Sequence, residues 1–445
     1  TRAMPEAIKL MLWVADTPLL RLRLFTMSKH TSWTGRLVAV LLAVLMVLGW
    51  SAPQANALTE EQKLLAEVWR LVDRAYVDDT FNQQNWWLVR QKAFKQPLSD
   101  REQTYTAIQQ MLASLDDPFT RLLKPVQYRS LQTNTSGELT GVGLQIASDP
   151  ETGKLRVIAP VAGSPADRAG IKPADTIVSI DGTPTEALSL DDAAGRMRGK
   201  IGSEVTLTIQ REQESLLDFK VVRDRIELNP VYADLRLQST PANTDEPAKI
   251  GYIRLSQFNA NATVEFAHAL AHLETQGANA YILDLRNNPG GLLQAGVEIA
   301  RLWLDKGTIV YTVNRQGIQG SFDATEKALT HDPLVVLVNQ GTASASEILA
   351  GALKDNGRAT ILGEKTFGKG LIQSLFDLSD GSGLAVTVAK YETPGHIDIN
   401  KQGIQPDVTV PLDPITGAQV GTPADRQYQA AVELLTTHSM VAGAV

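Results

Sequence analysis

The stretch PLVVLVNQGTASASEILAGALKDNG, residues 333–357, joins a short apolar run to a segment with helical spacing. The apolar run has the length and the β-branched content of a buried strand, and GTAS (341–344) marks the turn between the two parts. The same order recurs in residues 280–304, where AYILDLR leads through NNPGG into LLQAGVEIARLWL. Apolar strands that alternate with helices predict a largely parallel sheet with helices on its faces. We therefore expect a mixed α/β core, which we place at residues 229–417.

Three further regions flank this core. Residues 58–130 are predicted to be helical, because apolar side chains recur there at helical spacing, as in Leu64, Leu65, Val68, Leu71 and Val72. Residues 131–228 contain short β-like runs divided by Gly, Pro and Asp, which predicts a β-rich domain. Residues 418–445 predict a C-terminal helix that packs on the core. The predicted fold class is thus α/β multidomain.

The composition excludes several functional classes. The net charge of −7 over 445 residues argues against nucleic acid as a main partner, because phosphate binding needs a basic surface. The absence of cysteine excludes disulfides, thiol catalysis and zinc–thiolate sites. His268 and His272 share a helical face, but Ala269 stands where a zinc helix of the H-E-x-x-H type needs glutamate. We expect neither a metal nor a cofactor.

The N-terminal residues predict export. From Met27 the chain has a basic start, an apolar run at 37–50 and then small residues up to Ala57. This is the three-part pattern of an export signal, residues 27–57, with cleavage after Ala57, although an uncleaved anchor stays open as an alternative. Residues 1–26 precede a plausible start methionine, and we expect this extension to be absent from the mature protein.

Ser344 is the first candidate for chemistry. Ser344 and Glu347 match the S-x-x-E capping box of a helix start, which is the structural interpretation. A serine at a strand–turn–helix junction also lies at the carboxyl end of a sheet, where sites of open α/β sheets occur. The amide of Ala345 would then point toward a group above the hydroxyl, supported by the helix dipole. A serine nucleophile needs a base, and no histidine stands nearby in the sequence.

Lys369 is a candidate for that base. It stands between Gly368 and Gly370 in EKTFGKGLIQ, residues 364–373, where a bent backbone can bring its side chain inward. Desolvation lowers the pKa of a lysine, and a neutral amine can accept the serine proton. A phosphate loop is disfavoured, because Gly370 replaces the Ser/Thr that follows the lysine in that motif. Gln373, four residues later, can orient the amine without adding charge if the chain bends at the glycines, and otherwise it is an exposed strand residue.

Two glycine-containing segments are candidate binding loops. In DLRNNPGG (284–291), Pro289 and two glycines expose amides at a helix start, as an oxyanion hole requires. In GVGL (Gly141, Val142, Gly143 and Leu144), free amides before a strand can bind a carboxylate, and the strand edge can accept an extended peptide. Each segment can equally be a plain turn or bulge.

Taken together, these motifs resemble the C-terminal processing (tail-specific) peptidases, which are Ser–Lys serine endopeptidases with a PDZ domain. The resemblance covers nearly all of residues 58–445. It rests on five segments in the same order: GVGL (141–144), GSPADRAGIKPADTIVSIDG (163–182), LDLRNNPGG (283–291), SASEILAGALKDNGRA (344–359) and GEKTFGKGLIQ (363–373).

The resemblance implies a role for each matching position. The nucleophile falls on Ser344, the general base on Lys369 and the glutamine of the family triad on Gln373. The oxyanion donors fall on the amides of Gly290 and Ala345. A family aspartate falls on Asp355, Arg198 is implied to couple the PDZ domain to the active site, and GVGL is implied to bind the substrate C-terminus.

The resemblance also implies an activity and a compartment. Members of the family recognise a protein C-terminus and remove a C-terminal extension. Residues 67–93 look like the photosynthetic branch, which trims the precursor of a photosystem II reaction-centre protein in the thylakoid lumen. We expect a lumenal or periplasmic enzyme, soluble or peripheral, and a protein substrate with an apolar tail that can be membrane-bound. A non-catalytic PDZ tethering protein and a Ser-His hydrolase using His331 or His396 stay open.

Overall fold

The computed structural model describes residues 58–149, 152–161, 163–211, 216–240, 243–411, 415–416 and 419–442. The upstream extension and the export signal, residues 1–57, lie outside the described residues. Residues 59–445 form one compact unit. No helix in the described ranges is both long enough and apolar enough to span a bilayer.

A six-stranded sheet forms the centre of the core. Its strands follow the order β10-β11-β12-β15-β16-β19. Their bounds are β10 Val231–Thr240, β11 Asn243–Leu255, β12 Ala280–Asp284, β15 Leu334–Val338, β16 Thr360–Gly363 and β19 Val408–Thr409. All neighbours from β11 to β19 are parallel, and only β10 and β11 pair antiparallel. The predicted mixed α/β core with parallel strands is confirmed.

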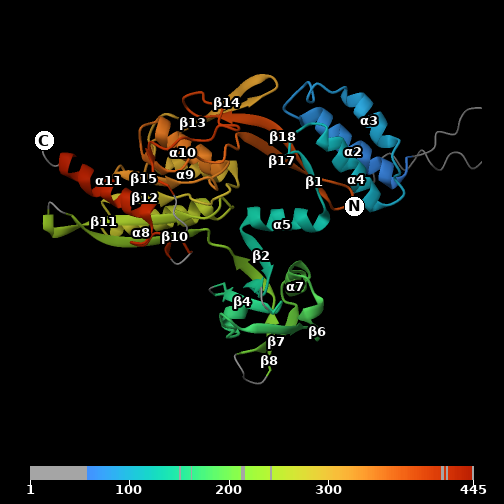
Figure 1. The fold of residues 1–445 in the computed structure, drawn as a ribbon, viewed down its shortest axis with the longest axis horizontal. Helices are drawn as coiled ribbons and strands as arrows, with labels where there is room; N and C mark the ends of the chain where they lie inside the picture. Colours follow the sequence, from blue (N-terminus) through green and yellow to red (C-terminus); the bar gives the residue numbers. More distant parts are fainter. Residues whose placement is uncertain are drawn as a thin grey trace, which may run out of the picture. The chain divides into compact units, whose positions relative to one another are not determined.

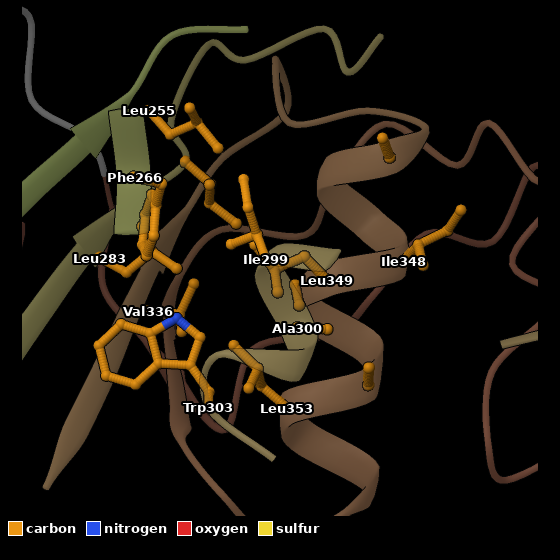
Figure 2. Packing of buried hydrophobic residues seen from close by; sticks show 14 of the residues in the cluster. Leu255, Phe266, Leu283, Ile299, Ala300, Trp303, Val336, Ile348, Leu349 and Leu353 are labelled. Atoms are coloured by element: carbon orange, nitrogen blue, oxygen red, sulfur yellow. The ribbon is translucent and has the colours of Figure 1, made fainter. Parts of the chain in front are cut away.

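Helices cover both faces of this sheet. Side chains alternate between the faces along each strand, and both faces carry apolar residues that must be buried. Tyr281 and Leu283 of β12 pack in one apolar cluster with α8 (Ala262–Thr275), α9 (Leu293–Arg301) and α10 (Ala345–Asp355). Figure 2 shows this cluster around Trp303 and Val336. Ile282, between them, packs on the other face with Tyr428 of α11 (Arg426–Ala442). Each fully buried aliphatic side chain contributes about 1.5–3 kcal/mol.

A second, antiparallel sheet carries the segment after Lys369. It consists of β1 (Arg121–Leu123), β13 (Thr308–Asn314), β14 (Gly317–Asp323), β17 (Leu371–Asp377) and β18 (Gly383–Glu392). Strands β17 and β18 form a hairpin whose turn contains Asp380 to Ser382, as the sequence DGSG predicts. The glycine at 383 leaves room for the ring of Tyr128, which a Cβ would meet at 2.2 Å.

The N-terminal region is helical, as predicted. It contains α2 (Glu60–Ala75), α3 (Trp86–Phe94) and α4 (Arg101–Ala113), followed after β1 by α5 (Pro125–Ser136) (Figure 1). On the predicted apolar face of α2, Leu64, Leu65, Val68 and Val72 are buried and Leu71 is partly buried. This face packs in one cluster with Leu384 and Val386 of β18.

A β-rich module follows α5. Its first and last strands, β2 (Glu138–Gly141) and β9 (Asp224–Glu227), pair as a two-stranded ribbon. The strands between them in the chain form a sheet of β3 (Leu144–Ser148), β4 (Leu155–Pro160), β5 (Thr176–Ile180), β6 (Thr183–Pro184), β7 (Glu204–Gln210) and β8 (Leu217–Val222). Two helices, α6 (Pro165–Arg168) and α7 (Leu190–Met197), and the 3-10 turn Thr185–Ala187 complete it. Its own apolar core includes Val157, Ile177 and Leu207.

Candidate active site

Ser344 lies where the turn after β15 enters α10. Its backbone has φ 57° and ψ −117°, a conformation that a residue with a Cβ adopts only under strain. Its N–H donates to Glu347 Oε2 at 2.9 Å, and its carbonyl accepts the Glu347 N–H at 2.8 Å. Strain of this kind persists only where the surrounding structure holds the residue in place. Strained residues are concentrated at functional sites.

Glu347 joins the serine segment to the lysine segment. Its side chain is fully buried and accepts four hydrogen bonds. Oε2 accepts the backbone N–H of Ser344 at 2.9 Å and that of Lys369 at 2.8 Å. Oε1 accepts the Gly368 N–H at 2.7 Å and the Thr366 hydroxyl at 2.5 Å. One carboxylate therefore fixes the backbone on which both candidate catalytic residues stand.

Tyr391 of β18 adds a second link between the two segments. Its hydroxyl donates to the carbonyl oxygen of Ser344 at 3.1 Å and also lies in contact with the carbonyl oxygen of Lys369. Burial raises the pKa of Tyr391 well above its ordinary value, so the hydroxyl keeps its proton. The backbones of Ser344 and Lys369 are thus held together on two sides.

The Lys369 amine occupies a desolvated position near the end of the N-terminal helical region. Burial lowers the pKa of Lys369 below its ordinary value, and the positive charge of Arg121 lowers it further. The carboxylates of Glu347 and Asp117 act in the opposite direction. The amine lies 5.0 Å from the centre of the Phe119 ring. Among the described contacts, no hydrogen bond joins Lys369 Nζ to Ser344 Oγ.

Gln373 lies on β17 but does not bond to the lysine amine in this structure. Its amide nitrogen is 3.5 Å from Oγ1 of Thr387, to which it donates. Thr387 in turn donates to Asp117 Oδ2 at 2.7 Å. The glutamine is therefore connected to the neighbourhood of Lys369 through Thr387 and Asp117.

Two amides stand beside Ser344. Gly290 has φ 92°, and a Cβ there would lie 2.8 Å from Ser344 Cβ and 2.9 Å from Ala345 N, so only glycine fits. The Ala345 N–H is in the first turn of α10 and donates to no acceptor in the described part of the chain. The Gly290 N–H donates to Asn288 Oδ1 at 2.9 Å in this structure.

A buried charge network supports the Gly290 loop. Arg286 donates to Asp284 at 2.6 Å and to Asp425 at 2.7 Å, and all three side chains are buried. Burial acts to raise the pKa of Asp425, but the Arg286 guanidinium and other hydrogen bonds outweigh it and hold the pKa below its ordinary value. Since Asp425 directly precedes α11, this network ties the C-terminal helix to the loop that follows β12.

Asp355 and the candidate histidines lie apart from this cluster. Asp355 ends α10, about 16 Å along the helix from Ser344, and accepts the Gly395 N–H at 2.9 Å. His331 is hydrogen-bonded to Asp305, and His396 stacks on Tyr311 with the ring centres 4.3 Å apart. In the part of the chain that the structure describes, neither histidine is hydrogen-bonded to Ser344.

The segment Gly141–Leu144 lines a groove of the β-rich module. A cavity of about 70 Å³ lies between it and α7, with Ile146, Ala194 and Met197 in its wall. Gly143 has φ 78° and directs its carbonyl to the Val161 N–H at 2.9 Å. The amides of Val142 and Gly143 donate to no acceptor among the described residues. Arg198 is exposed at the end of α7 and lines the same cavity.

Several residues of the site were not predicted to act there. Glu347 was identified only as a helix cap, and its contacts with residues 366–369 require the folded chain. Phe119 and Asp117 belong to DDPFTRLL (116–123), in which the only signal was a proline that ends a helix. Tyr391 had no local signal at all.

Comparison with known proteins shows the family. The model of peptidase family S41 matches residues 249–410, and a PDZ-domain model matches residues 156–211. The fold and the site thus define a peptidase of family S41 that carries a PDZ domain. A carboxyl-terminal-processing protease of Synechocystis is 62% identical over 399 residues, which are 89% of this chain and 92% of that protein. The chain belongs to the carboxyl-terminal-processing proteases.

Two further relatives extend this comparison. The chloroplastic carboxyl-terminal-processing peptidase 2 of Arabidopsis thaliana is 50% identical, over 84% of this chain and 74% of that protein. The solved structure of a photosystem II D1 C-terminal processing protease is 45% identical, with a TM-score of 0.54, and covers 80% of this chain and 94% of that one.

Proposed function

We propose that this chain is an exported serine endopeptidase that uses a Ser344–Lys369 dyad to remove a C-terminal extension from the precursor of the photosystem II D1 protein. One observation carries the catalytic part: a strained serine at a helix start shares a buried carboxylate with the segment that bears a desolvated lysine. Among the described lysines, no other combines a lowered pKa with such a link to a serine.

The proposed reaction begins with proton transfer to the lysine. The amine moves from the face of Phe119 to Ser344 Oγ and accepts the hydroxyl proton. Oγ then attacks the carbonyl carbon of the scissile peptide bond. The lowered pKa of Lys369 makes the neutral amine available at a lower pH than in a free lysine.

The developing oxyanion is stabilised by main-chain amides. The Ala345 N–H is free to donate, and it stands at the positive end of α10. The Gly290 N–H becomes a second donor when it leaves Asn288. The Lys369 ammonium gives its proton to the leaving amine, and an acyl-enzyme on Ser344 remains. Water then attacks the acyl group, passing a proton through Lys369, and releases the shortened protein.

A substrate C-terminus is selected by the groove that Gly141–Leu144 lines, which we call the PDZ groove. The free amides of Val142 and Gly143 can donate to the terminal carboxylate, and the edge of β3 can pair with an extended tail. The apolar wall formed by Ile146, Ala194 and Met197 suits a small apolar last residue. Arg198 stands at the same groove and is the candidate for coupling tail binding to catalysis.

The proposed substrate and compartment rest on similarity and on the N-terminal sequence. The D1 processing protease is a structural relative at 45% identity, and chloroplastic peptidases are among the sequence relatives. The export signal at residues 27–57 suits a thylakoid-lumen or periplasmic enzyme. N-terminal sequencing of the protein recovered from a cyanobacterial host tests the signal, which predicts Leu58 as the first residue.

Incubation with a D1 precursor tests the whole proposal. Mass spectrometry should show a shortened precursor with the parent protein and an intact precursor with Ser344→Ala or Lys369→Ala. Lys365→Ala changes an exposed lysine four residues away and should leave cleavage unchanged. An intact precursor that still binds the parent would indicate a tethering protein. Full activity in Lys369→Ala would indicate a histidine base, and cleavage of other tails but not of D1 would refute only the substrate.

A further inference from the structure

The outer face of α3 exposes apolar side chains that the fold does not use. The inner face of this helix packs Trp86 and Ala93 into the helical region. On the opposite side, Trp87 is 51% exposed and Leu88 is 49% exposed. With 3.6 residues per turn, the exposed residues form one continuous face. We call this the α3 face: Trp87, Leu88, Gln91, Lys92 and Lys95.

The exposed Trp87 ring is held in one position. It packs edge-on against Trp69, with ring centres 6.0 Å apart. The Arg90 guanidinium lies between these two rings, at 4.9 Å from the Trp87 centre and 5.1 Å from the Trp69 centre. The indole N–H of Trp69 is bonded to the Trp86 carbonyl at 3.0 Å. The tryptophan is therefore ordered by its neighbours while half of its surface stays exposed.

The same helix concentrates positive charge. Residues 80–99 contain Arg90, Lys92 and Lys95 but no aspartate or glutamate, in a chain of net charge −7. In the described part of the chain, none of these three cations forms an ion pair. Unpaired cations beside an exposed aromatic surface favour an anionic partner, because they can bind its negative charges without first breaking ion pairs within the protein.

We propose that the α3 face docks on an anionic lipid bilayer. Trp87 and Leu88 enter the headgroup region, where amphipathic tryptophan is most stable, and Lys92 and Lys95 extend to the lipid phosphates. This is the composition of an interfacial helix, with basic residues beside tryptophan and leucine. The docking is independent of the peptidase mechanism.

Two other occupants fit less well. A second copy of the chain would bring three positive charges against three positive charges. A protein partner in a stable complex buries about 800 Å² on each side, whereas α3 has nine residues and is about 14 Å long. A bilayer requires no such area, since binding grows with each apolar side chain and each cation that reaches the surface.

Vesicle co-sedimentation tests the proposal. The chain from Leu58 is used, because it holds the compact unit 59–445 and lacks the apolar run at 37–50, which would bind lipid by itself. It should sediment with phosphatidylglycerol vesicles at low salt, and much less with phosphatidylcholine vesicles or at about 1 M salt. Lys92→Gln with Lys95→Gln should lower the partition coefficient about 30-fold.

Two further variants make the test specific. Leu88→Ser should weaken sedimentation several-fold while the two lysines remain. The control, Tyr232→Ser with Leu237→Ser, removes an aromatic and a leucine of β10 that are even more exposed than Trp87 and Leu88, and it should bind as the parent does. Equal binding of all variants, equal binding to both lipids, or no binding to phosphatidylglycerol would overturn the proposal. A change of oligomeric state in the α3 variants would instead identify a protein interface and overturn it too.

Discussion

Replacement of Glu347 by glutamine weakens the link between the serine and lysine segments without changing side-chain size. An amide has one acceptor oxygen where the carboxylate has two. The best fit keeps that oxygen on the Ser344 and Lys369 amides and places the NH₂ group toward Gly368 and Thr366. The Thr366 hydroxyl can turn and accept, but the buried Gly368 N–H has no acceptor left.

The cost of this change follows from the hydrogen bonds. One orphaned buried donor costs about 1–3 kcal/mol, and two bonds that lose their charge assistance cost about 1 kcal/mol each. Glu347→Gln should therefore lower the free energy of unfolding by about 3–5 kcal/mol. This is below the usual 5–15 kcal/mol total for a domain, so the variant should still fold. Glu347→Ala orphans four donors and should not fold.

Urea unfolding followed by circular dichroism measures the loss, and cleavage of a tail peptide measures the effect on catalysis. The turnover number of Glu347→Gln should fall, because a neutral amide oxygen holds the Ser344 and Lys369 backbones less strongly than a carboxylate and Gly368 loses its acceptor. Binding of the tail to the PDZ groove should not change. Glu433→Gln makes the same substitution at an exposed position of α11 and should match the parent. A Glu347→Gln midpoint equal to that of the control would refute the argument.

Three further predictions concern the dyad. The rate of cleavage should rise about tenfold per pH unit below the lowered pKa of Lys369 and become constant above it. Arg121→Gln should move this rise to higher pH, because Arg121 lowers that pKa. A rise at the same pH in both proteins would contradict this assignment. Phe119→Leu should increase the turnover number about two- to fivefold below the pKa of Lys369, since loss of a cation–π contact of about 0.5–1 kcal/mol destabilises the ammonium and raises the fraction of neutral amine; a slower variant would count against this contact. In thermal unfolding, Ser344→Gly should be more stable than Ser344→Ala by about 1 kcal/mol, because glycine relieves the strain at φ 57°; equal stabilities would show that there is no strain.

The sequence predicted the fold to the level of its elements. Helical spacing at 61–77 and the alternation of apolar strands with helices were sufficient, since both patterns are local and periodic. The sequence also indicated which strand–turn–helix junctions carry the candidate site, because glycine and proline mark them. The positions of Ser344 and Gly290 side by side follow from the neighbouring parallel strands β12 and β15, which end at the same edge of the sheet.

The contacts that organise the candidate site could not be predicted from the sequence. Glu347 meets residues 366–369 through a return of the chain that no local pattern encodes, and Phe119 reaches Lys369 from another region of the chain. The Gln373 amide was expected beside the lysine but is bonded to Thr387. Pairings between distant segments depend on tertiary packing, and periodicity carries no information about them.

The shared carboxylate of Glu347 limits how this enzyme can be switched on and off. Because the Ser344 and Lys369 amides donate to the same carboxylate oxygen, the two segments cannot separate without leaving buried donors unpaired. Alignment of the proposed dyad is then left to rotations within the lysine side chain, which occur far faster than loop or domain motion. An inactive enzyme in this conformation needs no unfolding to become active. A small molecule that holds the lysine against Phe119 would inhibit it without changing the backbone.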